Sequence, residues 1–169
     1  MTDLDIAQSV TPRPILEIAS QLGIRAEELT LYGQYKDKIS AHILDRLDTV
    51  PVGRDLIVTA ISPTPLGEGK TTTSIGLAMA LTRLGRRTAL TLRQPSLGPV
   101  FGVKGGGTGG GHAQVVPMED INLHLTGDAH AVAASHNLLS AFLDNHLFHG
   151  NPLSIDPTRT PWPRTLSVN

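Results

Sequence analysis

A glycine-rich loop between an apolar segment and an amphipathic segment is the feature that most constrains the fold of this chain. Residues 56–61 (Leu-Ile-Val-Thr-Ala-Ile) are apolar and β-branched almost throughout, which is typical of a strand covered on both faces. After the loop at residues 64–71, apolar side chains recur at helical spacing from Ile75 until Gly85, a residue type that commonly ends a helix. This order predicts a strand, a tight loop and a helix.

A second β-type segment, at residues 88–92, follows the predicted helix and completes a βαβ unit. Two strands joined in this way are parallel, and their crossover is right-handed. A third strand is predicted at residues 121–125, and a helix rich in alanine and leucine from about Asp128 to Leu147. The sequence therefore predicts an α/β fold with a parallel sheet flanked by helices, similar to the phosphate-loop NTPases and incomplete in extent.

The N-terminal segment, residues 1–50, is predicted to be a helical lead-in. Pro14 is suited to a first helical position, and apolar residues then repeat at helical spacing until Gly23. A second helix is predicted from Ser40 to Leu47, with serine at its start.

The expected domain organisation has two parts. Residues 1–151 form a nucleotide-binding part, in which residues 54–147 are the α/β core. Residues 152–169 are predicted to be an irregular, truncated tail, because four of the 12 prolines lie between positions 152 and 163.

Composition and charge exclude several classes of function. The 14 basic and 15 acidic side chains give a formal net charge of -1, so no strong field attracts the chain to nucleic acid or to an anionic membrane. The absence of cysteine excludes a thiolate nucleophile, a cysteine zinc site and disulfides, and it is compatible with a reducing cytoplasm. No apolar run approaches the ~18 residues that cross a bilayer. The seven histidines show no metal-ligand spacing. We therefore expect a soluble cytoplasmic protein.

The loop is the candidate nucleotide site, since it follows the pattern G-x-x-x-x-G-K-[ST] except that threonine replaces the first glycine. The residues expected to contact the nucleotide form one continuous run: Thr64, Pro65, Leu66, Gly67, Glu68, Gly69, Lys70, Thr71 and Thr72. Glycine lets backbone N–H groups approach phosphates, and the start of the following helix supplies further donors.

Individual roles follow from this pattern. Lys70 is expected to reach the outer phosphates of ATP, and the Thr71 hydroxyl to bind Mg²⁺. Glu68 is predicted to be a solvated loop carboxylate. The structural alternative is a glycine-rich turn between strand and helix with an exposed lysine.

Two charged residues are expected near the phosphates, because ligands of parallel sheets lie at the C-terminal ends of strands. Arg93 follows the second predicted strand, and Asp128 follows the third at the start of a helix. Arg93 is a candidate clamp for an acidic substrate, and Asp128 a candidate for orienting magnesium or a substrate group. The alternatives are an exposed strand-end arginine and a helix-capping aspartate. The glycine run at residues 105–111 is compatible with an anion-binding nest, a mobile lid or a flexible surface loop.

Three longer runs of sequence resemble signatures of the formate–tetrahydrofolate ligase family. They are residues 62–73 around the loop, residues 93–102 beginning Arg-Gln-Pro-Ser, and residues 117–128 ending Thr-Gly-Asp, continued by Asp-Asn-His at residues 144–146. In that family, threonine also stands at the first position of the loop.

The resemblance implies a two-step ligation that uses ATP, Mg²⁺ and tetrahydrofolate. Formate would attack the terminal phosphate to give formyl phosphate, and an amine of tetrahydrofolate would then accept the formyl group. By this resemblance Lys70 stabilises the transferred phosphoryl group, Thr71 binds magnesium, Arg93 holds formate, and Asp128 positions groups or transfers a proton.

Two departures from the family pattern accompany the resemblance. Gln94 stands where the family has glutamate. Family members are several times longer, and the similarity fades near Thr158, so the resemblance implies an N-terminal fragment whose tetrahydrofolate site lies elsewhere. It also implies a homotetramer. Another phosphate-loop ATPase or small-molecule kinase, and a non-catalytic nucleotide-binding fragment, are the alternative functions.

Overall fold

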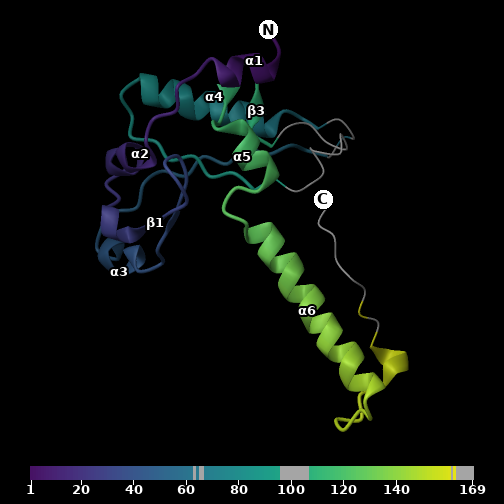
Figure 1. Cartoon of the computed structure of the whole chain (residues 1–169). Coiled ribbons are helices and arrows are strands. Elements are labelled where there is room, and N and C mark those ends of the chain that lie inside the picture. Colours follow the sequence, from purple (N-terminus) through teal and green to yellow (C-terminus); the bar gives the residue numbers. More distant parts are fainter. Residues whose placement is uncertain (63, 65–66, 96–106, 161, 163–169) are drawn as a thin grey trace. The chain divides into compact units, whose positions relative to one another are not determined.

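The computed structural model describes the chain except for residues 63, 65–66, 96–106, 161 and 163–169 (Figure 1). It divides into two compact units, Met1–Thr126 and Gly127–Asn169. The described elements follow one another in this order: α1 (Asp3–Gln8), α2 (Ile15–Gln21), η1 (Ala26–Glu28), β1 (Leu29–Leu31), β2 (Asp37–Ile39), α3 (Ile43–Leu47), α4 (Lys70–Arg83), β3 (Gly109–Gly110), β4 (Ala113–Gln114), α5 (Met118–Leu123), α6 (Asp128–Phe148) and η2 (Pro157–Arg159).

The predicted helices of the lead-in are present. Helix α2 begins directly after Pro14, which is its N-cap, and Gly23 follows the helix with φ of 79°. Helix α3 occupies the second half of the helix predicted from Ser40 to Leu47. Between them, β1 and β2 form an antiparallel hairpin that the sequence pattern did not predict.

A partly buried ion pair links η1 to α3 in this segment. The Arg46 guanidinium donates to both carboxylate oxygens of Glu28, at 2.6 and 2.7 Å, and the Arg25 N–H donates to Glu28 at 2.8 Å. The Glu28 side chain is only 11% exposed. The Arg46 guanidinium, and then the Arg25 N–H, lower the pKa of the Glu28 carboxyl from its ordinary 4.5 to about 2.

This lowered pKa predicts how stability depends on pH. A carboxyl whose pKa is lower when folded contributes stability that is present above its ordinary pKa of 4.5 and is lost as pH falls toward about 2. We expect Glu28→Gln to lower the urea midpoint at pH 7, and the gap between the variant and the native chain to close as pH falls to 2. Glu27→Gln, which removes an exposed carboxylate next to it, is the control. A gap that is constant over this pH range would contradict the assignment.

Helix α4 confirms the helix predicted after the loop and forms a buried contact in the first unit. Ile75 on α4 is 2% exposed and packs against the β3–β4 hairpin. The helix ends where the pattern predicts, since Gly85 adopts φ of 75° just beyond the C-cap residue Leu84.

The strand predicted at residues 121–125 is wrong, because residues Met118–Leu123 form helix α5. The alternation of Ile121, Asn122 and Leu123 imitates a strand. However, Pro117 precedes the segment as N-cap, and Glu119 and Asp120 lie in the first turn, where acidic side chains favour a helix N-terminus.

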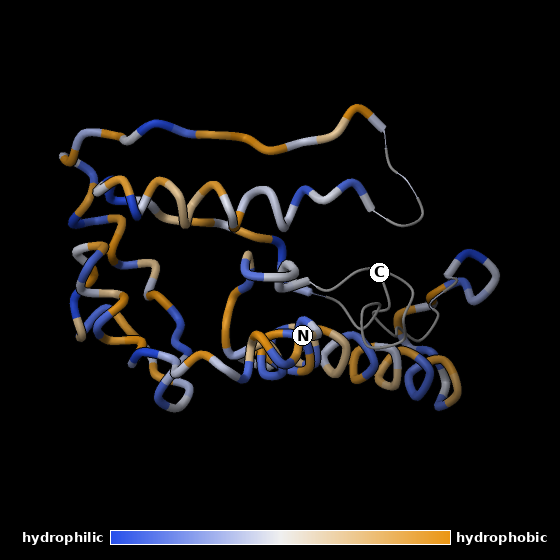
Figure 2. Tube along the Cα trace, turned by 90° about the horizontal axis from the view of Figure 1, so that it is seen from above, coloured by the Kyte–Doolittle hydropathy of each residue, from blue (hydrophilic) through white to orange (hydrophobic). Residues whose placement is uncertain are grey.

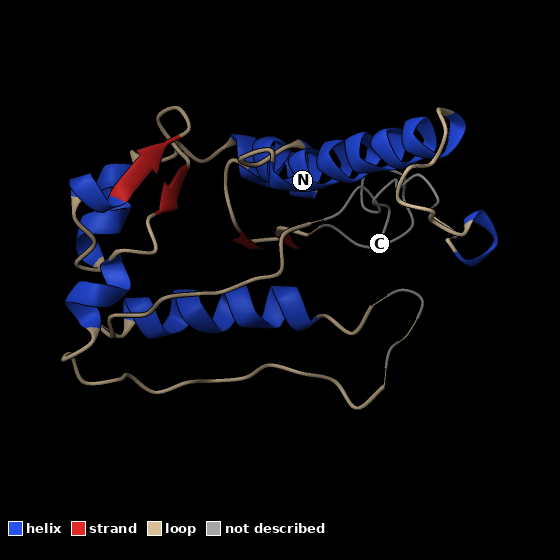
Figure 3. Cartoon of the chain, turned by 90° about the horizontal axis from the view of Figure 1, so that it is seen from below, coloured by secondary structure: helices blue, strands red, loops and turns tan. Residues whose placement is uncertain are grey.

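The predicted parallel sheet is not present in the part of the chain that the structure describes. Its only sheets are the two antiparallel hairpins β1–β2 and β3–β4, so the architecture is mixed helix and strand. Residues 56–61 and 88–92 are drawn as loop (Figure 3). The tube through residues 56–61 is largely apolar (Figure 2), and Leu56 and Ile57 are 67% and 87% exposed. A strand forms only when neighbouring backbone groups pair with it, and these runs lack such neighbours here.

The second unit consists mainly of helix α6, which confirms the helix predicted from Asp128 to Leu147. After the helix the chain turns back through Gly150 and Asn151 to η2, and the ring of Trp162 stacks on that of His136 at 5.5 Å. No helix in the described residues is both long enough and apolar enough to cross a membrane.

Candidate functional site

The second half of the candidate loop has the backbone that a phosphate site requires. Gly67 and Gly69 adopt φ of 88° and 74°, a left-handed conformation that is open to glycine and costly for other residues. Gly69 is the N-cap of α4, and no side-chain hydrogen bond caps the helix there. The first N–H groups of an α-helix have no partner within the helix, so this end can donate to an anion. Pro65 and Leu66 lie outside the described residues.

Glu68 lies across the loop and joins its two ends. One carboxylate oxygen accepts a hydrogen bond from the Thr64 N–H, and the other pairs with the Lys70 ammonium. The Lys70 ammonium, followed by the Thr64 N–H, lowers the pKa of the Glu68 carboxyl. The Glu68 side chain is 16% exposed, so the prediction of a solvated carboxylate is wrong. Sequence reasoning missed this contact because it depends on the φ angles of the loop glycines.

The first two of the three threonines after Lys70 lie in the first turn of α4. Thr71 is partly buried and Thr72 is exposed. In the described residues, no group of three or more histidine or acidic side chains gathers as a metal cage. A magnesium ion that is bound chiefly by substrate phosphates needs no such cage, because it keeps several waters and takes few protein ligands. The role of Thr71 as a single hydroxyl ligand to magnesium stays a prediction.

The other two candidate residues lie outside the loop in the sequence. Arg93 is an exposed residue of the first unit, beyond the segment predicted as the second strand. Asp128 is the first residue of α6, whose N-cap is Gly127 with φ of 82°, so the helix-capping alternative for Asp128 is not supported. Asp128 belongs to the second unit. The structure thus brings together Thr64, Glu68 and Lys70, and the convergence of Arg93 and Asp128 on them stays a prediction.

The described part of the glycine run, residues 107–111, is packed structure rather than an open loop. Thr108 is 1% exposed, and β3 pairs with β4 directly after it. The Asp3 carboxylate of α1 accepts from the Gly111 N–H at 2.9 Å. Gly109 has φ of 91°, and a Cβ there would lie 2.7 Å from Ile75 Cδ1 and overlap the Ala113 carbonyl oxygen.

This packing makes Gly109→Ala a destabilising substitution. The left-handed backbone and the overlap with Ala113 and Ile75 together cost about 1–3 kcal/mol of unfolding free energy. Urea denaturation followed by circular dichroism measures the change. Gly53→Ala is the matched control, because a Cβ at Gly53 meets nothing within 4 Å and the backbone there is unstrained. Equal midpoints for the two variants would contradict the packing of this hairpin.

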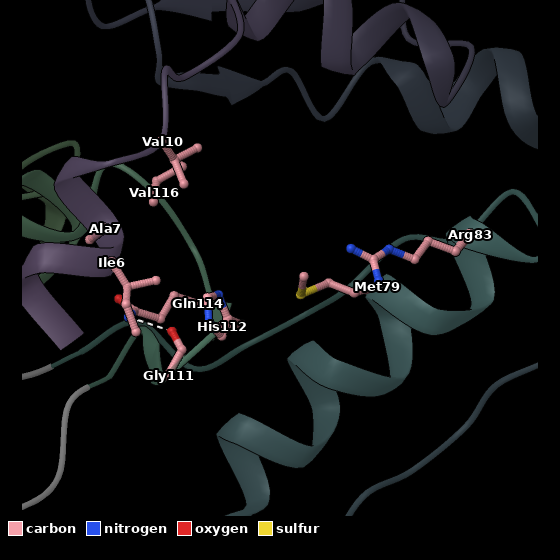
Figure 4. Close-up of a pocket in the computed structure, with 9 residues that line it drawn as sticks. All are labelled: Ile6, Ala7, Val10, Met79, Arg83, Gly111, His112, Gln114 and Val116. Carbon is pink, nitrogen blue, oxygen red and sulfur yellow. Dashed lines mark hydrogen bonds between the residues drawn. The ribbon is translucent and has the colours of Figure 1, made fainter. Parts of the chain in front are cut away.

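A cavity of about 420 Å³ lies between α1, α4 and the β3–β4 hairpin (Figure 4). It has the size of a small-molecule pocket. Its lining residues are Ile6, Ala7, Val10, Met79, Arg83, Gly111, His112, Gln114 and Val116. The lining includes none of the predicted site residues. Arg83 ends α4, and a helix of 14 residues places it about 20 Å from Lys70 along the axis.

The family model described as formate–tetrahydrofolate ligase matches residues 1–169, which is the whole chain.

Proposed function

Because the chain belongs to the formate–tetrahydrofolate ligase family, we propose that it carries the ATP and formate half of the ligation that yields 10-formyltetrahydrofolate through formyl phosphate. The observation that carries this proposal is the loop before α4. Two left-handed glycines, an uncapped helix N-terminus and the Lys70 ammonium gather there within four residues. A triphosphate is the ligand that such a constellation of N–H donors and positive charge suits best.

The first proposed step is transfer of the terminal phosphoryl group of ATP to formate. An oxygen of formate attacks the γ-phosphorus while the bond to the β-phosphate oxygen breaks, which gives formyl phosphate and ADP. The Lys70 ammonium stabilises the charge that builds up on the transferred group. Formate is a weak nucleophile, so alignment and charge neutralisation supply most of the rate.

The second proposed step transfers the formyl group. An amine of tetrahydrofolate attacks the formyl carbon, phosphate leaves with the oxygen that formate contributed, and the nitrogen loses its proton. Arg93 is proposed to hold formate and then the acyl phosphate through paired hydrogen bonds. Asp128 is proposed to orient a substrate group or to take up the proton.

Magnesium is proposed to enter with ATP, with Thr71 as its protein ligand. When bound, the ion neutralises charge on the β- and γ-phosphates. Thr71 is the second residue of α4, in the first turn, where the backbone N–H groups have no partner within the helix.

The proposal extends to the fold and the assembly. Residues 56–61 and 88–92 come before and after α4 in the sequence. They are proposed to be parallel strands of one sheet, and their exposed apolar side chains support this. A homotetramer in the cytoplasm is proposed from the family. The molar mass in solution, measured by light scattering, checks the oligomer.

Formate dependence tests the function. The chain is incubated with Mg-ATP, formate and hydroxylamine, which converts formyl phosphate to formyl hydroxamate, and ADP is measured in parallel. We expect ADP and hydroxamate in equal amounts, and neither without formate. ADP release that ignores formate would instead favour another phosphate-loop ATPase. Mg-ATP binding without any turnover would favour a non-catalytic nucleotide-binding fragment.

A further inference from the structure

The contacts of Glu68 imitate those of a bound phosphate. Its two oxygens engage the Thr64 N–H and the Lys70 ammonium, which are the groups that the loop would offer to an anionic ligand. The carboxylate is mostly shielded, at 16% exposure, whereas the Lys70 side chain is 44% exposed. An anion that belongs to the chain itself therefore holds the position of a ligand anion.

We propose that Glu68 is an internal competitor at the phosphate position, and that it makes the loop select magnesium-bound polyphosphate over anions of single charge. The inference rests on the proposed function, since it concerns the same loop. It assigns to Glu68 the role of a specificity-determining residue.

The selectivity follows from what each ligand gains. Glu68 is two residues from Lys70, so its carboxylate faces the ammonium at a local concentration on the order of millimolar or higher. A free carboxylate or phosphate monoanion that displaces it replaces one such contact with an equivalent one and gains little. A triphosphate with magnesium also engages the N–H groups of α4 and the Thr71 hydroxyl, so its additional contacts outweigh the loss.

Glu68 competes with ligand anions at neutral pH because it carries a negative charge there. Lys70 and Thr64 lower the pKa of the Glu68 carboxyl below its ordinary value of 4.5, so it is ionised at neutral pH. One substrate of the proposed reaction, formate, is itself a carboxylate of single charge. Without the Glu68 carboxylate beside it, the Lys70 ammonium would bind formate at the position that the terminal phosphate must occupy.

Glu68→Gln in the full chain tests the inference. Glutamine keeps the length of the side chain and an oxygen that can accept from Thr64, but it removes the charge that holds Lys70. We expect the Kd of Mg-ATP, measured by isothermal titration calorimetry, to fall about tenfold, the effect of losing one charge-assisted contact in the free state. We also expect inorganic phosphate and formate to compete with Mg-ATP in the variant at millimolar concentrations that leave the native chain unaffected. Glu17→Gln removes the same charge from α2 and is expected to change neither result.

An unchanged or weaker affinity for Mg-ATP in Glu68→Gln would overturn the inference. If Lys70→Ala still abolished binding in the same assay, the proposed nucleotide site would stand without the inference about Glu68. If the native chain and Glu17→Gln failed to bind Mg-ATP, both the proposed function and the inference about Glu68 would fail. Glu68→Asp is the second variant, because its shorter side chain cannot span Thr64 and Lys70. It is expected to tighten Mg-ATP binding by a smaller factor, and it decides the question should Glu68→Gln not fold.

Discussion

Lys70→Ala is expected to lower formate-dependent ADP release by roughly 10²–10³-fold, the usual cost of removing one preorganised group that stabilises charge in a transition state. Binding of Mg-ATP should weaken as well, because Lys70 meets the phosphates in the ground state. The structure adds a second reason for a large effect. Without the ammonium, the Glu68 carboxylate loses its positively charged partner and repels the phosphates. Steady-state ADP release and calorimetric binding of Mg-ATP measure the two effects.

Arg87→Ala is the control for this experiment. It removes the same positive charge from an exposed position just after α4. We expect its turnover and its Kd for Mg-ATP to match those of the native chain. If Lys70→Ala retained native turnover, the phosphate loop would not be the site of phosphoryl transfer.

Arg93→Lys is expected to lower turnover at subsaturating formate by roughly 10²-fold while the Kd of Mg-ATP changes less than about twofold. Lysine keeps the charge but loses the planar pair of donors that matches a carboxylate, so the loss should fall on formate. The measurement is the dependence of ADP release on formate concentration, with Mg-ATP at saturation. Arg86→Lys, the same exchange at an exposed position after α4, is the control. Equal losses of formate and Mg-ATP affinity would contradict a formate-specific role.

Helices α2, α4 and α6 could be predicted from the sequence because their signals are local. Each has a recognisable beginning and an apolar repeat, and Gly23 and Gly85 end α2 and α4 in the left-handed conformation. Such signals do not depend on the rest of the molecule. The loop before α4 was predictable for the same reason, since the positions of Gly67, Gly69 and Lys70 are fixed by a contiguous motif.

The strands could not be predicted in the same way, because a strand depends on a partner. Residues 56–61 and 88–92 have the composition of buried strands but no strand pairing in the described structure. The β1–β2 hairpin was missed for the opposite reason. Its strands have three residues each, too few for an alternating pattern to stand out.

Part of the candidate site could be predicted from local sequence and part could not. The backbone of the loop follows from its glycines. The position of Glu68 does not, since its contacts form only in the folded chain. The contact of Asp3 with Gly111, 108 residues apart, is likewise beyond any local pattern. A cue for the Glu68 contact was nonetheless present, because an acidic residue two positions before the loop lysine can reach its ammonium.

Isotope transfer tests most directly whether formate attacks the terminal phosphate of ATP in a site built by this chain. The native chain is incubated with Mg-ATP and formate that carries ¹⁸O at both oxygens. The ¹⁸O content of the released inorganic phosphate is then measured by mass spectrometry. Formyl phosphate breaks at its carbon–oxygen bond when water or an amine attacks the formyl carbon. We therefore expect phosphate with one ¹⁸O atom from the native chain, and roughly 10²–10³-fold less of it from Lys70→Ala in the same time. Unlabelled phosphate, released at the same rate with and without formate, would contradict the claim.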